Sequence, residues 1–208
     1  MKFPKAILLT TVVAMALFAH KSFSVPLDAA AIASEPSPGL KDTVVLIIRH
    51  AEKPEEGAEL SPTGQQRAIA YVNYFKNFTV NSKPLRPDYL VATADSEKSR
   101  RPRLTLLPLA QDLGLTIDNH VKNKNFANEV EDLRTTHHGK CVLIAWHHEK
   151  IPDLIEGLGA DPNKLFPGGK WPSGIFNWVI ELHYDHEGRL IPSECKRINE
   201  KLLPGDSD

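Results

Sequence analysis

Residues 43–54 read TVVLIIRHAEKP, an apolar run that ends in an arginine and a histidine. Residues 43–48 are aliphatic or β-branched and do not alternate with polar side chains, which is typical of a short strand buried on both faces. Such strands belong to mostly parallel sheets that are covered by helices on both sides. Arg49 and His50 would then stand at the carboxyl end of the strand, where sheets of this kind bind their ligands.

Three further apolar segments have the length and composition of buried strands. They are residues 89–93 (YLVAT), 141–146 (CVLIAW) and 176–184 (FNWVIELHY). Between the first two strands, Ser61 and Pro62 supply an N-cap and a first helical residue. We expect further helices over about 101–113 and 152–158, each followed by a glycine that ends it. This alternation predicts an α/β protein with three layers (α/β/α) and a mostly parallel central sheet.

Basic side chains follow three of the expected strands. Arg49-His50 follows the first, residues 96–102 (SEKSRRP) follow the second, and His147-His148 follows the third. We expect these groups to meet at one edge of the sheet. Arginine binds phosphate oxygens through two parallel hydrogen bonds, and a neutral imidazole is a competent nucleophile near pH 7. The pattern therefore predicts a site for a phosphoryl group.

Four segments, in order along the chain, carry a more specific pattern. They are IIRHAEKP (47–54), LSPTGQQRA (60–68), SRRPRLTLLPLA (99–110) and VLIAWHHEKIPDLIEGLG (142–159). They resemble, in turn, the Arg-His nucleophile motif, the L-T-x-x-G-x-x-Q-A helix start, the S-x-R-x-x-x-T-A-x-x-L-A segment and the second-histidine block of the histidine phosphatase superfamily. The chain is thus similar to an exported, first-branch member of that superfamily, whose fold is called phosphoglycerate mutase-like. The resemblance covers roughly residues 43–184.

The resemblance implies phosphomonoester hydrolysis through a phosphohistidine intermediate. His50 would be the nucleophile, while Arg49, Arg101 and a second histidine would hold the phosphoryl oxygens. Arg101, rather than Arg100, has the family's spacing to Thr105. The scheme needs no metal or cofactor, and its substrate is a small phosphorylated molecule whose identity the sequence leaves open.

Two neighbouring residues compete for the role of the second histidine. Counted back from Ile151-Pro152, the family pattern G-H-S-x-x-I-P selects His147, whereas W-x-H-x-x-I-P selects His148 and includes Trp146. Adjacent residues at a strand end point to opposite faces, so we expect only one to face His50. The second pattern matches more residues and favours His148.

The acid that protonates the leaving group is not fixed by any motif. Glu129 and Glu131 lie in the stretch where relatives carry their acid, and Glu52 is close to His50 in sequence. Lys53, in the same motif, is a candidate contact for the substrate.

Three alternatives to a phosphatase remain open. The altered Trp-His-His block would suit a noncatalytic phospholigand-binding module of the same fold. A mutase of the family is disfavoured because the segment that would hold its longer inserts is short. A metal hydrolase is disfavoured because the nine histidines include no His-Glu-x-x-His helix.

The first 24 residues resemble a secretory signal. Lys2 and Lys5 precede an apolar run over 6–19, and Ser22-Phe23-Ser24 offers a cleavage site. An uncleaved anchor is the alternative, but the run is shorter than the roughly 20 residues that cross a bilayer. We expect a periplasmic or secreted protein, with residues 25–41 as a flexible linker and 42–208 as the phosphatase-like domain, and no stable membrane insertion after cleavage.

Charge and cysteine content add two expectations. Cleavage would remove Lys2, Lys5 and Lys21 and change the formal net charge from −1 to −4, which gives no sign of a nucleic-acid partner. Cys141 and Cys195 could form a disulfide outside the cytoplasm. Because Cys141 opens an apolar run, a small buried residue is the favoured interpretation.

Overall fold

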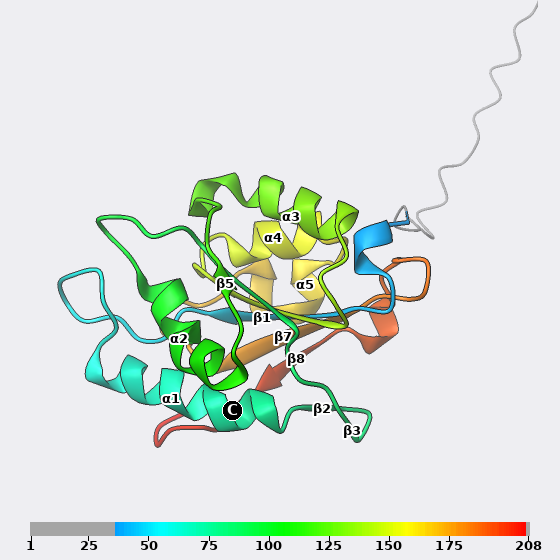
Figure 1. Ribbon diagram of the computed structural model, residues 1–208. Helices are drawn as coiled ribbons and strands as arrows, with labels where there is room; N and C mark the ends of the chain where they lie inside the picture. The colour runs from blue at the N-terminus through cyan, green and yellow to red at the C-terminus, as the bar shows by residue number, and fades with distance from the viewer. Residues whose placement is uncertain (1–35, 207–208) are drawn as a thin grey trace, which may run out of the picture. The chain divides into compact units, whose positions relative to one another are not determined.

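The computed structural model of the protein describes residues 36–206 (Figure 1), so the predicted signal and most of the predicted linker lie outside the described residues. A six-stranded sheet with the strand order β5-β4-β6-β1-β7-β8 forms the middle layer. Its strands are β1 (Val44–Arg49), β4 (Tyr89–Ala92), β5 (Ile117–Asp118), β6 (Cys141–Trp146), β7 (Trp178–His183) and β8 (Lys196–Asn199). The first four in this list are mutually parallel, whereas β7 and β8 run antiparallel to their neighbours. A separate hairpin joins β2 (Thr79–Val80) to β3 (Lys83–Pro84).

Helices cover both faces of this sheet (Figure 1). The α-helices are α1 (Pro62–Lys76), α2 (Arg101–Leu113), α3 (Phe126–Thr135), α4 (Ile151–Gly157) and α5 (Pro162–Leu165). The short 3₁₀ helices are η1 (Pro38–Leu40), η2 (Asn123–Asn125), η3 (Pro167–Gly169) and η4 (Pro192–Glu194). Helices α1 and α2 lie on one face, and α3, α4 and α5 lie on the other. The predicted three-layer α/β/α fold with a mostly parallel sheet is confirmed.

The core consists of two apolar layers, one on each side of the sheet. Alternate residues of β1 enter different layers, because side chains of a strand point to opposite faces. Leu46 packs in the layer with Phe75 of α1, whereas Ile47 packs in the layer with Leu133 of α3 and Leu154 of α4. All five side chains are fully buried. This two-sided burial explains the unalternated apolar sequence of the strand.

Several predicted boundaries agree with the structure. Ser61 caps α1, accepting a hydrogen bond on its side chain from the Gly64 amide, and α2 ends at Gly114, whose φ of 68° lies in the left-handed region. The last predicted strand is shorter than expected, since Phe176 precedes β7. The packed chain also begins before residue 42, because Leu40 of η1 is 1% exposed. Leu40 supplies apolar area that a flexible linker would leave in water.

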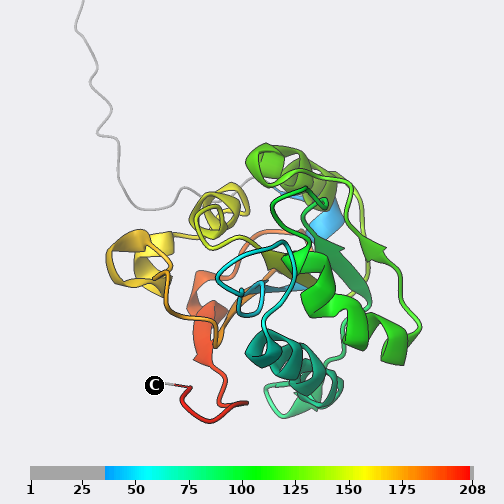
Figure 2. The same cartoon turned by 90° about the vertical axis from the view of Figure 1, so that its left-hand side faces the viewer.

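The carboxyl ends of β1 and β6 are neighbours, with Arg49 opposite Trp146. After β1 the chain continues into α1 on one face, and after β6 it continues into α4 on the other. In this class of fold, ligands usually bind at the sheet edge where neighbouring connections diverge in this way. Figure 2 looks toward this edge, where the cyan loop after β1 lies between the two helical layers.

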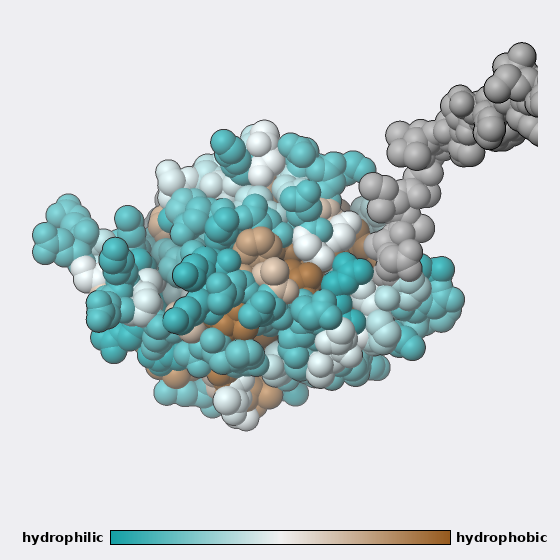
Figure 3. Space-filling view, turned by 90° about the horizontal axis from the view of Figure 1, so that it is seen from above, coloured by the Kyte–Doolittle hydropathy of each residue, from teal (hydrophilic) through white to brown (hydrophobic). Residues whose placement is uncertain are grey.

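The surface of the described part is largely polar. Ile69 is the one large hydrophobic side chain classed as exposed among residues 36–206, and the face in Figure 3 is mostly hydrophilic. No helix within those residues is long and apolar enough to cross a membrane. Cys141 is buried and Cys195 half-buried, and both thiols are free.

Candidate active site

His50 is the first residue beyond β1 and is 3% exposed. Its amide donates to the Trp146 carbonyl (2.9 Å), which continues the sheet pairing. Its Nδ1 lies 2.8 Å from the Ala51 carbonyl oxygen. Because a carbonyl can only accept, this contact places the proton on Nδ1 and leaves the Nε2 lone pair available. Burial lowers the pKa of His50 to about 2, so the ring is neutral at pH 7.

Arg49, the last residue of β1, is 2% exposed. Its Nη1 donates to the carbonyl oxygens of Ser173 (2.5 Å) and Ile175 (2.9 Å), and its guanidinium carbon lies 3.8 Å from the centre of the Phe176 ring. Burial lowers the pKa of Arg49 to about 10, which leaves it charged at pH 7. Its Nε is buried and has no hydrogen-bond partner among the described residues. The side chain is therefore fixed while one donor remains unused.

Arg101 and Arg100 differ sharply in environment. Arg101 donates to the carbonyl oxygens of Gly57 (2.9 Å) and Lys98 (3.3 Å). Its buried Nε lacks a partner within the described part of the chain, and burial lowers its pKa. It lies close enough to His50 to oppose protonation of that ring. Arg100 has a 51% exposed side chain and pairs with Glu59. Of the two, only Arg101 lies in the cluster, and its role as the phosphate-binding arginine stays a prediction from its spacing to Thr105.

Thr105 connects Arg101 to the loop that carries His50. Its side chain is fully buried; it accepts a hydrogen bond from the Ala51 amide (2.8 Å) and donates one to the Arg101 carbonyl (2.8 Å). The first turn of α2 is thereby fixed against the residue that follows His50.

The two candidate second histidines both lie in the cluster, in different places. The ring centroid of His147 is 5.0 Å from that of His50, in an edge-to-face arrangement. Burial lowers the pKa of His147 to about 4. For His148, burial and then the charge of Arg49 lower the pKa, and its Nδ1 is 3.3 Å from Oε2 of Glu149. Although the motif comparison favours His148, the structure sets His147 against the ring of His50.

Among acidic residues, Glu149 has the largest electrostatic effect on the basic cluster. Burial lowers the pKa of Arg49, Arg101 and His147, and the charge of Glu149 opposes that lowering in each case. Its Oε1 accepts from the side chain of Asn123 (3.2 Å). Its side chain is 55% exposed, so it stands at the open side of the cluster.

The three acids suggested by the sequence occupy other environments. Glu52 is bound by Arg67, which donates to both of its carboxylate oxygens. Glu129 is 1% exposed, and burial, followed by the charges of Asp118 and Asp132, raises its pKa to about 7. Glu131 is an exposed residue of α3. The contacts of these residues do not include the ring of His50.

Lys53 is exposed, and its charge acts on the pKa of His148 after burial, Arg49 and Glu149. It thus lies at the rim of the cluster rather than within it.

Phe176, Thr105 and Glu149 were not assigned to the site by sequence. Phe176 sits in an apolar run and was assigned to a strand. Because β7 is antiparallel to β1, its amino end lies at the edge where β1 ends, and this places Phe176 beside Arg49. The sequence did not indicate that β7 is antiparallel to β1, and this direction is what places Phe176 at the site. Glu149 follows His148 directly, so its position after β6 was a usable signal.

The combined geometry suits an oxyanion. Arg49 and Arg101 each retain a buried Nε donor without a partner among the described residues, and the neutral ring of His50, packed edge-to-face on His147, keeps its Nε2 lone pair available. Charge-assisted donors of this kind bind phosphoryl oxygens strongly where water is excluded. Within residues 36–206, no group of three or more His, Cys, Asp or Glu residues could hold a metal ion.

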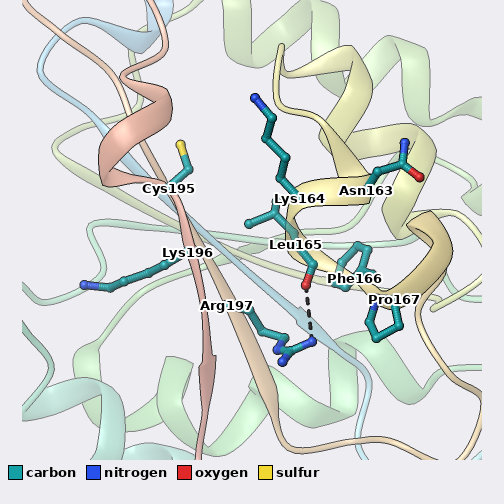
Figure 4. Close-up of a pocket in the computed structure, with 8 residues that line it drawn as sticks. All are labelled: Asn163, Lys164, Leu165, Phe166, Pro167, Cys195, Lys196 and Arg197. Atoms are coloured by element: carbon teal, nitrogen blue, oxygen red, sulfur yellow. Dashed lines mark hydrogen bonds between the residues drawn. The ribbon is translucent and has the colours of Figure 1, made fainter.

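A second basic region lies elsewhere, between α5 and β8 (Figure 4). This cavity of about 480 Å³ is lined by Lys164, Lys196 and Arg197 together with Cys195. Two of its three cations have partners: Lys196 pairs with Glu181 at 3.3 Å, and Arg197 donates to the Leu165 carbonyl at 3.3 Å. Figure 4 shows Lys196 and Arg197 pointing in different directions, as expected for neighbours on a strand.

Comparison with known proteins yields only distant similarities in fold. No protein-family model and no curated protein matches the chain. A phosphoglycerate mutase from Plasmodium falciparum is 15% identical with a TM-score of 0.48, over 80% of this chain and 96% of that one. An Escherichia coli protein provisionally described as an alpha-ribazole-5′-phosphate phosphatase is 13% identical with a TM-score of 0.49, over 79% and 99%. An Agrobacterium tumefaciens protein provisionally described as a phosphohistidine phosphatase is 17% identical with a TM-score of 0.46, over 72% and 96%. At these identities the likeness concerns the fold alone.

Proposed function

We propose that the protein hydrolyses phosphomonoesters through a phosphohistidine intermediate on Nε2 of His50. The observation that carries this proposal is a neutral, oriented His50 in a cluster with Arg49 and Arg101, each of which keeps a buried Nε donor without a partner in the described part of the chain. The four sequence motifs shared with the histidine phosphatase superfamily support the same reaction. The unidentified substrate is a small phosphorylated molecule.

In the first step Nε2 of His50 attacks phosphorus, and the bond from phosphorus to the leaving oxygen breaks. Arg49, Arg101 and His147 stabilise the charge on the other oxygens. The Nδ1 proton, held by the Ala51 carbonyl, stabilises the charged ring that forms. In the second step water attacks phosphorus, the bond from phosphorus to Nε2 breaks, and His50 returns to its neutral form.

Glu149 is our candidate for the acid that protonates the leaving oxygen and then takes a proton from the attacking water. It stands at the open side of the cluster, whereas Glu52 is occupied by Arg67. Loss of a general acid matters most for a basic leaving group. Glu149→Gln should therefore slow an alkyl phosphate by roughly 10²-fold and affect an aryl phosphate little, with Glu131→Gln as the matched control.

The decisive experiment measures phosphate release from an aryl phosphate and traps radiolabelled phosphoenzyme by rapid quenching. We expect turnover, an acid-labile phosphoenzyme, and the loss of both in His50→Ala. Activity of that variant within tenfold of wild type would exclude His50 as the nucleophile. Tight binding of phosphate compounds without turnover would favour the phospholigand-binding module. Activity abolished by a chelator and restored by zinc would favour a metal hydrolase.

We also propose that the protein acts outside the cytoplasm after cleavage near Val25. The N-terminal pattern of charged, apolar and small residues supports this location. Mass spectrometry of the natively expressed protein should find an amino terminus near Val25, and an intact Met1 would contradict cleavage.

A further inference from the structure

Arg67 of α1 is the centre of a buried ionic cluster next to the loop that carries His50. Its side chain is 3% exposed. Its Nε and Nη2 donate to the Glu52 carboxylate at 2.9 and 2.7 Å, while Nη1 and Nη2 donate to Asp206 at 3.1 and 2.6 Å. Burial would lower the pKa of Arg67, but the hydrogen bonds that it donates to Asp206 and Glu52 outweigh this effect and raise the pKa. One guanidinium thus joins two distant parts of the chain.

Asp206 belongs to the segment that follows β8. Its Oδ2 also accepts from the amides of Leu202 (3.0 Å) and Leu203 (2.9 Å), which folds residues 202–206 back on themselves. Its side chain is only 7% exposed. Glu200 lies 3.5 Å from Arg67 and accepts from the Tyr71 hydroxyl at 2.5 Å. Burial raises the pKa of Glu200 to about 8, whereas Asp206 and Glu52 accept the hydrogen bonds that Arg67 donates.

Glu52 is held on its backbone as well as its side chain. The Ser61 amide donates to the Glu52 carbonyl at 2.9 Å, and a Cβ on Gly64 would lie 2.4 Å from that oxygen. The amino end of α1 therefore packs directly against Glu52. The residue before it, Ala51, supplies the carbonyl that fixes Nδ1 of His50. A shift of Glu52 would move that carbonyl, and the orientation of the His50 ring depends on it.

We propose that Arg67 and Asp206 are positioning residues, and that the carboxyl-terminal segment 202–206 acts as a strap that holds Glu52 and, through Ala51, the ring of His50. The expected effect of this strap on turnover rests on the proposed function, whereas its expected effect on the orientation of the His50 ring is independent of that function. Misplacement of a reacting group by about 1 Å can cost about 10²-fold in rate. The strap therefore links the far end of the chain to the nucleophile.

The test compares Arg67→Ala and Asp206→Asn with Asp112→Asn, which alters the exposed pair between Lys76 and Asp112. We expect kcat to fall about tenfold or more with KM little changed in the first two variants, and no change in the control. Arg67 lines a cavity of about 300 Å³ together with Glu52 and Asp206. Millimolar guanidinium should therefore reach the space left in Arg67→Ala and restore activity, whereas ammonium should not.

A second readout needs no turnover. ¹⁵N NMR of histidine-labelled protein should report Nδ1–H as the single tautomer of His50 in the wild type and a mixture of tautomers in Asp206→Asn. An unchanged tautomer in Asp206→Asn, or activity lost only in proportion to unfolded protein, would overturn the strap. If the wild type releases no phosphate but the tautomer still responds to Asp206→Asn, the proposed function fails and the strap stands. If Arg67→Ala does not fold, Asp206→Asn alone decides.

Discussion

Basic side chains gather both at the edge of the sheet beyond β1 and in the cavity between α5 and β8. The two groups differ in burial and in whether their hydrogen-bond donors have partners. At the sheet edge Arg49 is 2% exposed, and Arg101 is partly buried. The Nε of each lacks a partner in the described part of the protein. In the cavity, Lys196 and Arg197 are exposed, Lys196 is paired with Glu181, and Arg197 stacks on Trp178 at 4.2 Å.

This difference supports the proposal that the sheet edge is a binding site and that the cavity holds a structural group of charges. Removing a charge from water is costly unless partners compensate for it, so the unused Nε donors of Arg49 and Arg101 support the proposed binding of an anion from outside. Exposed cations with partners imply nothing further, because water and neighbouring groups already satisfy them. The number of positive charges in a region is thus a poor guide to binding. Burial without pairing is the better one.

Among variants that test the difference between the two basic regions, the largest loss of activity is expected at Arg101. Arg101→Ala removes a buried donor and should reduce kcat/KM by about 10²–10³-fold, or roughly 3–4 kcal/mol, as for other preorganised donors. Arg100→Ala removes an exposed residue paired with Glu59 and should be nearly silent. Steady-state kinetics on one aryl phosphate measures both. The reverse ranking would place the phosphate beside Arg100 and break the link between burial and binding.

A somewhat smaller effect should distinguish the two histidines. Because the ring of His147 lies 5.0 Å from that of His50, we expect His147→Ala to lose roughly 10²-fold in kcat and His148→Ala to lose less. The W-x-H-x-x-I-P pattern gives the opposite ranking. Turnover of the two alanine variants decides between the pattern and the geometry, and equal modest losses would mean that neither ring contacts the phosphoryl group.

Burial of the site also predicts how stability depends on pH. Burial lowers the pKa of His50 to about 2 and that of His147 to about 4, against about 6.5 in an unfolded chain. Between these values the unfolded chain binds protons that the folded protein does not. Stability is therefore complete above about pH 6.5 and decreases as the pH falls toward 4, by up to about 1.4 kcal/mol per pH unit for each histidine.

Urea unfolding at pH 7.5, 6 and 5 measures this slope. The double variant His50→Gln/His147→Gln should show a flatter dependence on pH than the wild type. His186→Gln serves as the control, because its side chain is 75% exposed. An equally steep slope in the double variant would show that other groups cause the acid sensitivity.

The sequence predicted those parts of the fold that depend on local patterns. The apolar runs of β1 and β6 identify buried strands, and the Ser61-Pro62 start and the Gly114 stop follow from local backbone chemistry. The strand direction of β7 depends on long-range packing, and it determines where Phe176 lies. The sequence analysis also did not predict α3 or the short edge strand β5.

In the candidate site, too, the residues that local sequence patterns indicate differ from those whose environment depends on long-range contacts. Arg49, His50, Arg101 and the histidine pair follow strand ends, so a motif with a spacing is enough to name them. The environment of each acid requires tertiary contacts: Glu52 meets Arg67, fifteen residues later in the chain, and Glu129 is buried beside Asp118. No spacing rule indicates such partners in advance.

The smallest effect on activity is expected for substitutions in the cavity between α5 and β8. Arg197 keeps its place through the Leu165 carbonyl and the Trp178 ring, and Lys164 is an exposed residue of the short helix α5. Lys164→Ala/Arg197→Ala should therefore leave kcat/KM within about twofold of wild type and reduce stability by no more than about 1 kcal/mol. Isothermal titration of inorganic phosphate should detect one site in the wild type, retained in this double variant and lost in Arg101→Ala. Loss of phosphate binding in the cavity variant, with Arg101→Ala unaffected, would show that exposed and paired cations bind the anion here, and the burial criterion would fail for this protein.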